Sequence, residues 1–307
     1  MISTFDNARW RADPDAVREA LEANQIVFFP TCPVPMPDLA TLDFLRRELP
    51  SRLRLKNISY HPEADKVSGI EADDATTARV TYILRSHLGD VSAFLRRVAG
   101  DLTQDARIGT CSFRPIEEQG RNLKPHASNE LVHVDAGAYG ATNGDRILRF
   151  FVNVNGERDR VWATKGTFED VLNRHGRQAG LLDDSGRLCV SVTKAGADRA
   201  FSAVVAGLAH LNPLATVLDS SPYDRAMRRL HNYMKDDAGF RNDPAGLQEI
   251  RFPPYSAWTV FTDGVSHASL AGQFALVTTM IVRRARMRWP ERAPFNTLLA
   301  RAPAQAA

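Results

Sequence analysis

The sequence contains few cysteines and no long apolar run. Its three cysteines, Cys32, Cys111 and Cys189, are odd in number and widely spaced along 307 residues, which argues against a disulfide framework and a zinc knuckle. No stretch approaches the roughly 20 apolar residues that cross a bilayer. The first residues, Met1 to Asp15, contain aspartates and lack the apolar segment of a secretory signal. We therefore expect a protein of the reducing cytoplasm, soluble or peripheral to a membrane.

The chain also lacks an excess of charge of either sign. Its 39 Lys and Arg residues against 36 Asp and Glu residues give a formal charge of +3, too balanced to predict a nucleic-acid-binding surface. A hydrophobic content of 44% is ordinary for a globular protein. We expect one domain in three parts: N-terminal helical and strand support (1–105), a core (106–282) with a helical insertion at about 167–235, and a basic tail (283–307).

The segment Leu131–Asp135 carries the main candidate for chemistry. If it is a β-strand, His133 and Asp135 share one face, because side chains alternate along a strand. Far along the chain, His267 follows a second β-type segment, 257–262. Two histidines and one carboxylate on one side of a metal are the ligands of the non-heme Fe(II) oxygenases. The sequence between these ligands is long enough for the strands of a jelly roll.

The most regular strand pattern lies at 146–155. It places Leu148 and Phe150 on one face and Arg149 and Phe151 on the other. A guanidinium among apolar neighbours is costly unless an anion pairs with it, so Arg149 is a candidate for binding a carboxylate. An edge-strand arginine that reaches solvent is the alternative.

Other segments have helical or ordinary strand patterns. Apolar spacing predicts helices at 14–24, 39–49, 72–102, 168–175, 200–211 and from Ser221 onward, and strands at 25–30, 56–60, 107–115, 188–192 and 273–282. We interpret His87 and His231 as structural residues on helix faces. His126 is an alternative metal ligand, disfavoured because it lies in a polar loop.

Taken in order, several motifs resemble those of the bacterial Kdo hydroxylases, which are Fe(II)- and 2-oxoglutarate-dependent dioxygenases that hydroxylate the 3-deoxy-D-manno-oct-2-ulosonic acid (Kdo) sugar of lipid A. The resemblance covers about residues 21 to 282 and is more specific than the metal triad alone. The matching motifs are Ile26–Pro30, Lys56–Tyr60, Phe113–Pro115 with Gly120-Arg121, His133–Asp135, Arg146–Arg149 with Asn153, Arg160–Trp162, Ser221–Asp224, Leu230-His231 with Met234-Lys235, Phe252–Pro254, and Ser266-His267 with Gly272–Phe274.

The resemblance implies an α+β, mainly β fold, with a double-stranded β-helix (jelly-roll, cupin-like) core and flanking helices. It implies that His133, Asp135 and His267 bind iron. Arg149 would bind the 2-oxoglutarate carboxylate with Arg114 as a second cation, or Arg283 would take that role. Further cofactor-binding candidates are Asn153 and Thr279, and candidates for binding an acidic sugar or phosphate are Lys56, Arg121 and Lys124.

The function implied is 3-hydroxylation of Kdo-lipid A with Fe(II), 2-oxoglutarate and O2. The arginines at 283–288, next to Trp289, form either a solvated tail or a contact with the anionic inner membrane. Two other functions remain open at this point: a 2-oxoglutarate oxygenase for another small molecule, and a non-catalytic jelly-roll binding module.

Overall fold

Strand β6, Arg146–Asn153, lies near the centre of the larger sheet. In the computed structural model, which describes residues 1–137, 140–209 and 220–303, Leu148, Phe150 and Val152 pack in one apolar cluster. Phe151 belongs to a different cluster on the opposite face. This confirms the predicted alternation of β6, and it directs Arg149 to the same side as Phe151.

The larger sheet has eight strands, and only the β1–β2 pair is parallel. Strand β11 lies between β6 and β5 and pairs with both, so residues distant in sequence meet on one surface. In spatial order the strands are β1 (Ile2–Thr4), β2 (Ile26–Phe29), β9 (Ala257–Phe261), β6, β11 (Ala275–Val282), β5 (Arg107–Arg114), β3 (Ile58–His61) and β4 (Lys66–Ser68).

A second sheet has three antiparallel strands, β10 (Ala268–Ala271), β7 (Arg160–Thr164) and β8 (Gln248–Phe252). Aromatic residues from both sheets share one apolar cluster. The Phe151 and Trp258 rings of the larger sheet stack with centroids 5.0 Å apart, and the edge of Trp162 from β7 contacts both. The protein therefore has a mixed α/β fold in which an aromatic layer joins the two sheets.

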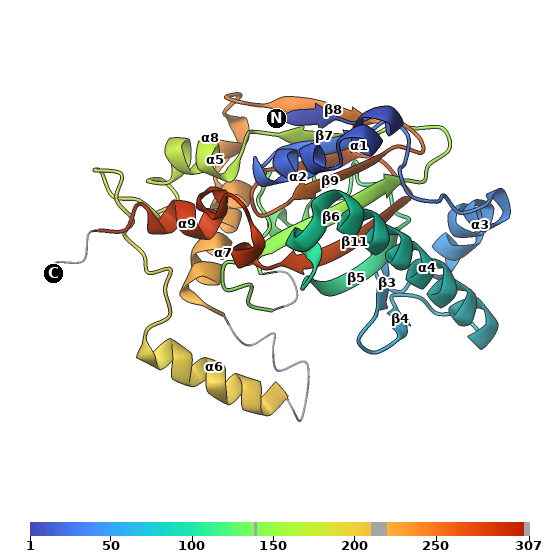
Figure 1. Ribbon diagram of the computed structural model, residues 1–307, viewed down its shortest axis with the longest axis horizontal. Helices are drawn as coiled ribbons and strands as arrows, with labels where there is room; N and C mark the ends of the chain where they lie inside the picture. Colours follow the sequence, from blue (N-terminus) through green and yellow to red (C-terminus); the bar gives the residue numbers. More distant parts are fainter. Residues whose placement is uncertain (138–139, 210–219, 304–307) are drawn as a thin grey trace.

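Helices cover the other face of the larger sheet (Figure 1). Helix α4, Asp74–Ala99, begins at Asp73, whose side chain accepts a hydrogen bond from the Thr76 amide, and ends at Gly100 with a positive φ of 57°. These termini confirm the predicted helix at 72–102. Packed nearby are α1 (Asn7–Ala12), α2 (Asp15–Glu22) and the short α3 (Leu39–Asp43), which continues as π- and 3₁₀-turns to Arg52.

A third group of elements packs behind the candidate metal segment. Val134 lies in an apolar cluster formed mainly by helices α5 (Phe168–His175), α7 (Pro222–Asp236), α8 (Ala238–Asn242) and α9 (Pro294–Leu299). The helix predicted from Ser221 onward is α7, and Ser221 and Asp224 form a capping box at its start. Helix α6 (Gly196–Ala209) projects from the rest of the chain in Figure 1. Among the described residues, no helix is long and apolar enough to cross a membrane.

Two predicted strands do not form. Residues 131–135 form no regular ladder of backbone hydrogen bonds. They make a single bridge, between His133 and His267, because no neighbouring strand continues the pairing. Residues 188–192 likewise make only the bridge between Leu182 and Leu188. The predicted helix 200–211 is α6, and its last two residues lie outside the described part of the chain.

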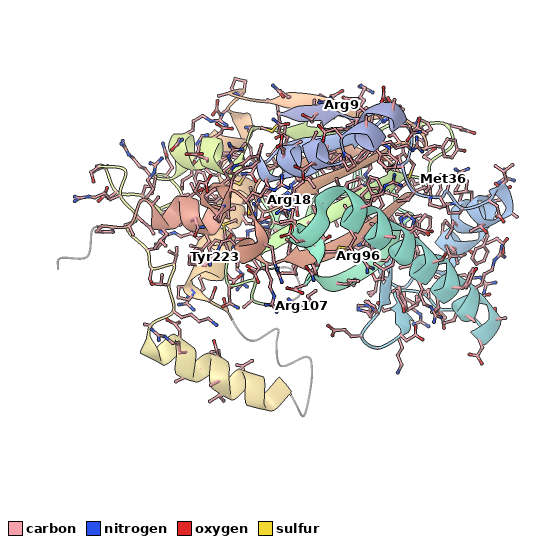
Figure 2. The ribbon with its side chains drawn as sticks, viewed as in Figure 1. Arg9, Arg18, Met36, Arg96, Arg107 and Tyr223 are labelled. Carbon is pink, nitrogen blue, oxygen red and sulfur yellow. The ribbon has the colours of Figure 1, made fainter. Side chains whose placement is uncertain are left out.

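The predicted basic tail is a folded segment through residue 303. Arg288 forms an ion pair with Asp15 at 2.5 Å, and Arg286 pairs with Asp105. Arg18 of α2, labelled in Figure 2, donates to the Arg286 carbonyl, and Glu22 of the same helix accepts from the Arg288 and Trp289 amides, so both residues join this region to the N-terminal helices. Paired arginines satisfy their charge within the protein, so a solvated tail is the wrong description of 283–303. Residues 304–307 lie outside the described part.

Candidate metal centre and cavity

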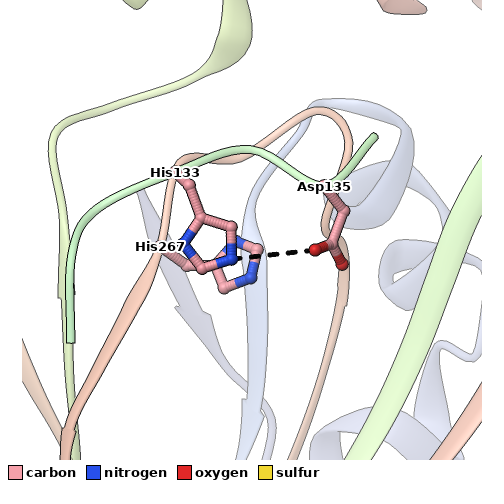
Figure 3. A group of neighbouring side chains, drawn as sticks. All are labelled: His133, Asp135 and His267. Carbon is pink, nitrogen blue, oxygen red and sulfur yellow. Dashed lines mark ion pairs between the residues drawn. The ribbon is translucent and has the colours of Figure 1, made fainter. Parts of the chain in front are cut away.

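Backbone pairing brings the two predicted histidine ligands together. The His133 amide donates to the His267 carbonyl at 3.0 Å, and the His267 amide donates to the His133 carbonyl at 2.8 Å. The Asp135 amide donates to the Thr262 carbonyl at 2.9 Å. These bonds fix three side chains at one point, although 131–135 is not a strand (Figure 3).

The three side chains have the spacing of a metal site. One ligand atom from each of His133, Asp135 and His267 lies within 4.8 Å of the others. His133 Nε2 is 3.8 Å from Asp135 Oδ1, and the two imidazole centroids are 4.7 Å apart. Two nitrogens and one carboxylate oxygen at this spacing fit a single divalent metal with its remaining positions open.

Hydrogen bonds leave one nitrogen of each imidazole available for the metal. Nδ1 of His133 lies 2.8 Å from the Leu131 carbonyl, and Nδ1 of His267 lies 3.0 Å from the Val265 carbonyl. Because a carbonyl only accepts, both Nδ1 atoms carry the proton. The Nε2 lone pairs are then free to bind a metal, as is usual for histidine ligands.

The surroundings favour the protonation states that bind metals. Burial lowers the pKa of His133 well below its ordinary value, and the charge of His267 acts in the same direction. Burial also lowers the pKa of His267. For Asp135, burial raises the pKa, but Arg149 and the two histidines outweigh it, and the net pKa is below the ordinary value. Neutral imidazoles and a carboxylate are the forms that coordinate a metal.

A polar cavity of about 290 Å³ opens from the triad. Register places Arg149, Thr279 and Thr110 side by side across β6, β11 and β5, and all three line the cavity. Five cationic side chains line it: Lys56, Arg114, Arg149, Arg160 and Lys235. A cavity with this lining suits a ligand that carries carboxylates.

Arg149 contacts the candidate metal ligand directly. Its Nη2 lies 2.9 Å from Asp135 Oδ2, and both side chains are largely buried. Thus the predicted carboxylate-binding arginine faces an anion of the protein itself. Its buried Nε has no hydrogen-bond partner, so this atom remains available to a further acceptor.

The structure places four other predicted residues away from the cavity lining. Asn153 is fully buried, and its amide donates to the Arg158 and Phe252 carbonyls, which is a structural role. Arg121 pairs with Glu118 at 3.3 Å. Lys124 and Arg283 are exposed. Sequence periodicity could not show that these residues lie outside the cavity lining, because their placement depends on the direction of the loops and on where β11 ends.

Sequence reasoning missed the contribution of α7. His231 and Lys235, one helical turn apart, both line the cavity. Nδ1 of His231 lies 2.7 Å from the Val134 carbonyl, and its ring centroid is 5.0 Å from that of His133. The i, i+4 spacing of two basic residues on a mostly apolar helix face was a signal for this role. The disfavoured His126 also lines the cavity, but its Nε2 binds Asp236 at 2.6 Å.

Strand β7 supplies two further lining residues that the predictions gave no role. Arg160 Nη2 donates to Glu118 at 2.9 Å, while its buried Nε has no partner. The buried Trp162 Nε1 also lacks a partner, and the Trp162 ring stacks on His267 at 5.2 Å. Buried donors without acceptors are rare, because each costs free energy unless a ligand or water satisfies it. These donors fit a ligand with carboxylate oxygens.

Comparison with known proteins identifies the family. The family model for 3-deoxy-D-manno-oct-2-ulosonic acid (Kdo) hydroxylase matches residues 6–304. The chain belongs to the Kdo hydroxylase family. The resemblance predicted from the ordered motifs, and the hydroxylase class with it, are thereby confirmed. Comparison with curated proteins gives no match.

Solved structures of Kdo hydroxylases resemble the chain over almost its whole length. An apo structure has 30% identity and a TM-score of 0.79, covering 97% of this chain and 95% of the other. A complex with α-ketoglutarate (2-oxoglutarate) and Fe(III) has 29% identity and a TM-score of 0.78, covering 100% and 98%. A cobalt(II) complex has 29% identity and a TM-score of 0.79 with the same coverage. Each is described as a non-heme Fe(II) α-ketoglutarate-dependent dioxygenase.

Proposed function

We propose that this Kdo hydroxylase uses Fe(II), 2-oxoglutarate and O2 to hydroxylate carbon 3 of the Kdo sugar on lipid A. The observation that carries the proposal is the His133, Asp135 and His267 triad at the wall of a cavity with unsatisfied buried donors. His133, Asp135 and His267 would hold the metal, and bound iron would supply the oxidative decarboxylation of 2-oxoglutarate and the transfer of an oxygen atom to the sugar.

The cavity arginines would bind and orient 2-oxoglutarate. Arg149 comes from β6 and Arg114 from β5, the strands on either side of β11, and Arg160 comes from the smaller sheet. Thr279 lies beside Arg149 and adds a hydroxyl. Trp162 Nε1 and Arg160 Nε are further donors. A dicarboxylate would satisfy several of these groups at once and would neutralise cations that are otherwise close together.

Protein groups around the triad would also fix the metal ligands and exclude water. Trp162 covers one face of His267, and His231 contacts His133 from α7. The carbonyls of Leu131 and Val265 hold the imidazoles in one tautomer. A ligand set that is already oriented loses little conformational freedom when it binds metal, and a closed cavity limits side reactions with water.

We further propose that residues 1–307 form one domain with a double-stranded β-helix core. Two sheets share an aromatic layer, and the triad lies where bridged segments cross between them. These features support the jelly-roll description that the sequence predicts. Residues 167–235 contribute α5, α6 and α7, as expected for a helical insertion.

The site of action in this proposal is the cytoplasmic surface of the inner membrane, where a lipid-linked sugar would be presented. Arg286 and Arg288 are paired within the protein, so the exposed Arg283 and Arg292, the latter stacked on Trp289, are the better candidates for anionic lipid contact. Co-sedimentation with vesicles of anionic or zwitterionic lipid tests this part separately.

Turnover assays test the substrate. The protein loaded anaerobically with Fe(II) should convert Kdo-lipid A to a product heavier by one oxygen, with one succinate formed per product. A panel of small metabolites should give only slow, uncoupled consumption of 2-oxoglutarate. Coupled turnover of a metabolite, without turnover of Kdo-lipid A, would contradict the proposed substrate but not the proposed oxygenase chemistry.

A further inference from the structure

Lys235 is a buried ammonium group at the wall of the cavity. Its side chain is 2% exposed, and it lies on α7 one turn after His231. Among the described residues, Nζ donates one hydrogen bond, to the His126 carbonyl at 3.2 Å. An ammonium group has three donors, and a buried charge with a single neutral acceptor is costly unless an anion joins it. The geometry therefore leaves Lys235 ready to bind an anion.

The carboxylates that attract Lys235 do not meet this need. Asp135 attracts Lys235 electrostatically but makes its ion pair with Arg149 and belongs to the metal triad. Asp236, the next residue on α7, binds His126. Lys56, which also lines the cavity, repels Lys235 because both are cations. Two lysines thus face the same cavity, and neither has a carboxylate of the protein within ion-pair distance among the described residues.

Charge balance assigns these lysines to a second ligand. Arg149 and Arg160 each have an internal carboxylate, Asp135 and Glu118. In the proposed function, the two positive charges of the metal balance the two carboxylates of 2-oxoglutarate, and Arg114 is a further cation assigned to this co-substrate. Lys56 and Lys235 remain as positive charge for which the co-substrate supplies no further anion.

We propose that Lys235, assisted by Lys56, binds the carboxylate of the acidic sugar and makes the enzyme selective for the acid form. This inference rests on the proposed function. In an oct-2-ulosonic acid the carboxyl carbon is two bonds from carbon 3, so a carboxylate anchor must lie close to the metal. Lys235 meets this requirement, because it lines the same cavity as the triad and lies one helical turn from His231, whose ring centroid is 5.0 Å from that of His133. Lys124, predicted for this role, lies outside the cavity lining.

The test compares two substrates in matched variants. Kdo-lipid A and its Kdo methyl ester are assayed with wild type, Lys235→Met, Lys235→Arg and the control Lys66→Met, an exposed lysine on β4. Losing a charged hydrogen-bond partner corresponds to roughly a 10- to 100-fold change in kcat/KM. We expect that loss for the acid with Lys235→Met, and a change of less than about threefold for the ester. Lys235→Arg should keep the preference for the acid, and Lys66→Met should match wild type.

Several results would overturn the inference. Equal losses on acid and ester would mean that Lys235 does not contact the carboxylate. A raised KM for 2-oxoglutarate, with the acid preference unchanged, would assign Lys235 to the co-substrate. If wild type hydroxylates neither substrate, the proposed function fails and the inference with it, whereas normal wild-type turnover with no effect at Lys235 refutes the inference alone. Should Lys235→Met not fold, the other two proteins still decide, since a wild-type enzyme without preference for the acid, or a folded Lys235→Arg variant that loses this preference, contradicts the proposal.

Discussion

Replacing Arg149 by Met should separate two roles that this arginine combines. The guanidinium lies 2.9 Å from Asp135 Oδ2 in a largely buried setting. At an effective dielectric constant of about 20, unit charges about 4 Å apart attract by about 4 kcal/mol, and removing one partner of a buried pair costs about 3–5 kcal/mol. We expect the metal-free variant to lose about 3 kcal/mol of folding stability.

Metal should restore most of that loss, because a divalent cation supplies the positive charge that Asp135 then lacks. Co(II) should therefore raise the midpoint of thermal unfolding more in Arg149→Met than in wild type. Affinity for 2-oxoglutarate, measured anaerobically on the metal-loaded protein, should fall roughly 10- to 100-fold, as expected for loss of a charged hydrogen-bond partner.

The matched control is Arg158→Met, an exposed arginine whose guanidinium lies 3.9 Å from a Glu117 carboxylate oxygen. It should change the free energy of unfolding by less than about 1 kcal/mol. It should leave the affinity for 2-oxoglutarate unchanged. The reasoning is refuted if Arg149→Met binds 2-oxoglutarate as wild type does, or if Co(II) stabilises both proteins equally.

Three other predictions follow from single contacts. Trp162→Phe removes an unpaired indole donor and should raise KM for 2-oxoglutarate several-fold with little change in Co(II) affinity, measured by titration. Asp263→Asn leaves the buried Arg146 without its 2.7 Å ion pair and should cost about 3 kcal/mol in urea denaturation. Burial lowers the pKa of His87 from 6.5 to about 4, so the unfolded chain binds more protons and stability falls as pH drops from about 6.5 to about 4. The free energy of unfolding of His87→Leu, relative to that of wild type, should therefore be about 2 kcal/mol higher at pH 5 than at pH 7.5. Urea denaturation with a chelator present, so that both proteins are metal-free, measures this difference.

Local patterns predicted much of the fold because they depend on neighbouring residues. Alternation along β6 predicted which residues share each of its faces, and the helical spacing from Ser221 onward predicted where α7 begins. Residues 131–135 have the same alternation but no ladder, because strand formation needs a partner along its length. The pairing that matters there, His133 with His267, joins distant segments that no local pattern can align.

The same distinction explains the candidate site. The candidate metal ligands and Arg149 could be named from chemistry and period-two alternation. Lys235 and Arg160 could not, because their role depends on how α7 and the smaller sheet pack against the larger one. Asn153 has the period of a cavity residue, yet its amide binds two backbone carbonyls. Sequence reasoning therefore identified the reactive groups better than the groups that surround them.

Anaerobic titration with Fe(II) and 2-oxoglutarate is the most direct test of the metal centre. The bound chelate has a visible absorption band, which should appear in wild type and in His126→Ala, since His126 lines the cavity outside the triad. The band should be absent in His267→Ala at the same concentrations. Absence of the band in folded wild type, or its full retention in His267→Ala, would contradict the assignment of His133, Asp135 and His267 as iron ligands.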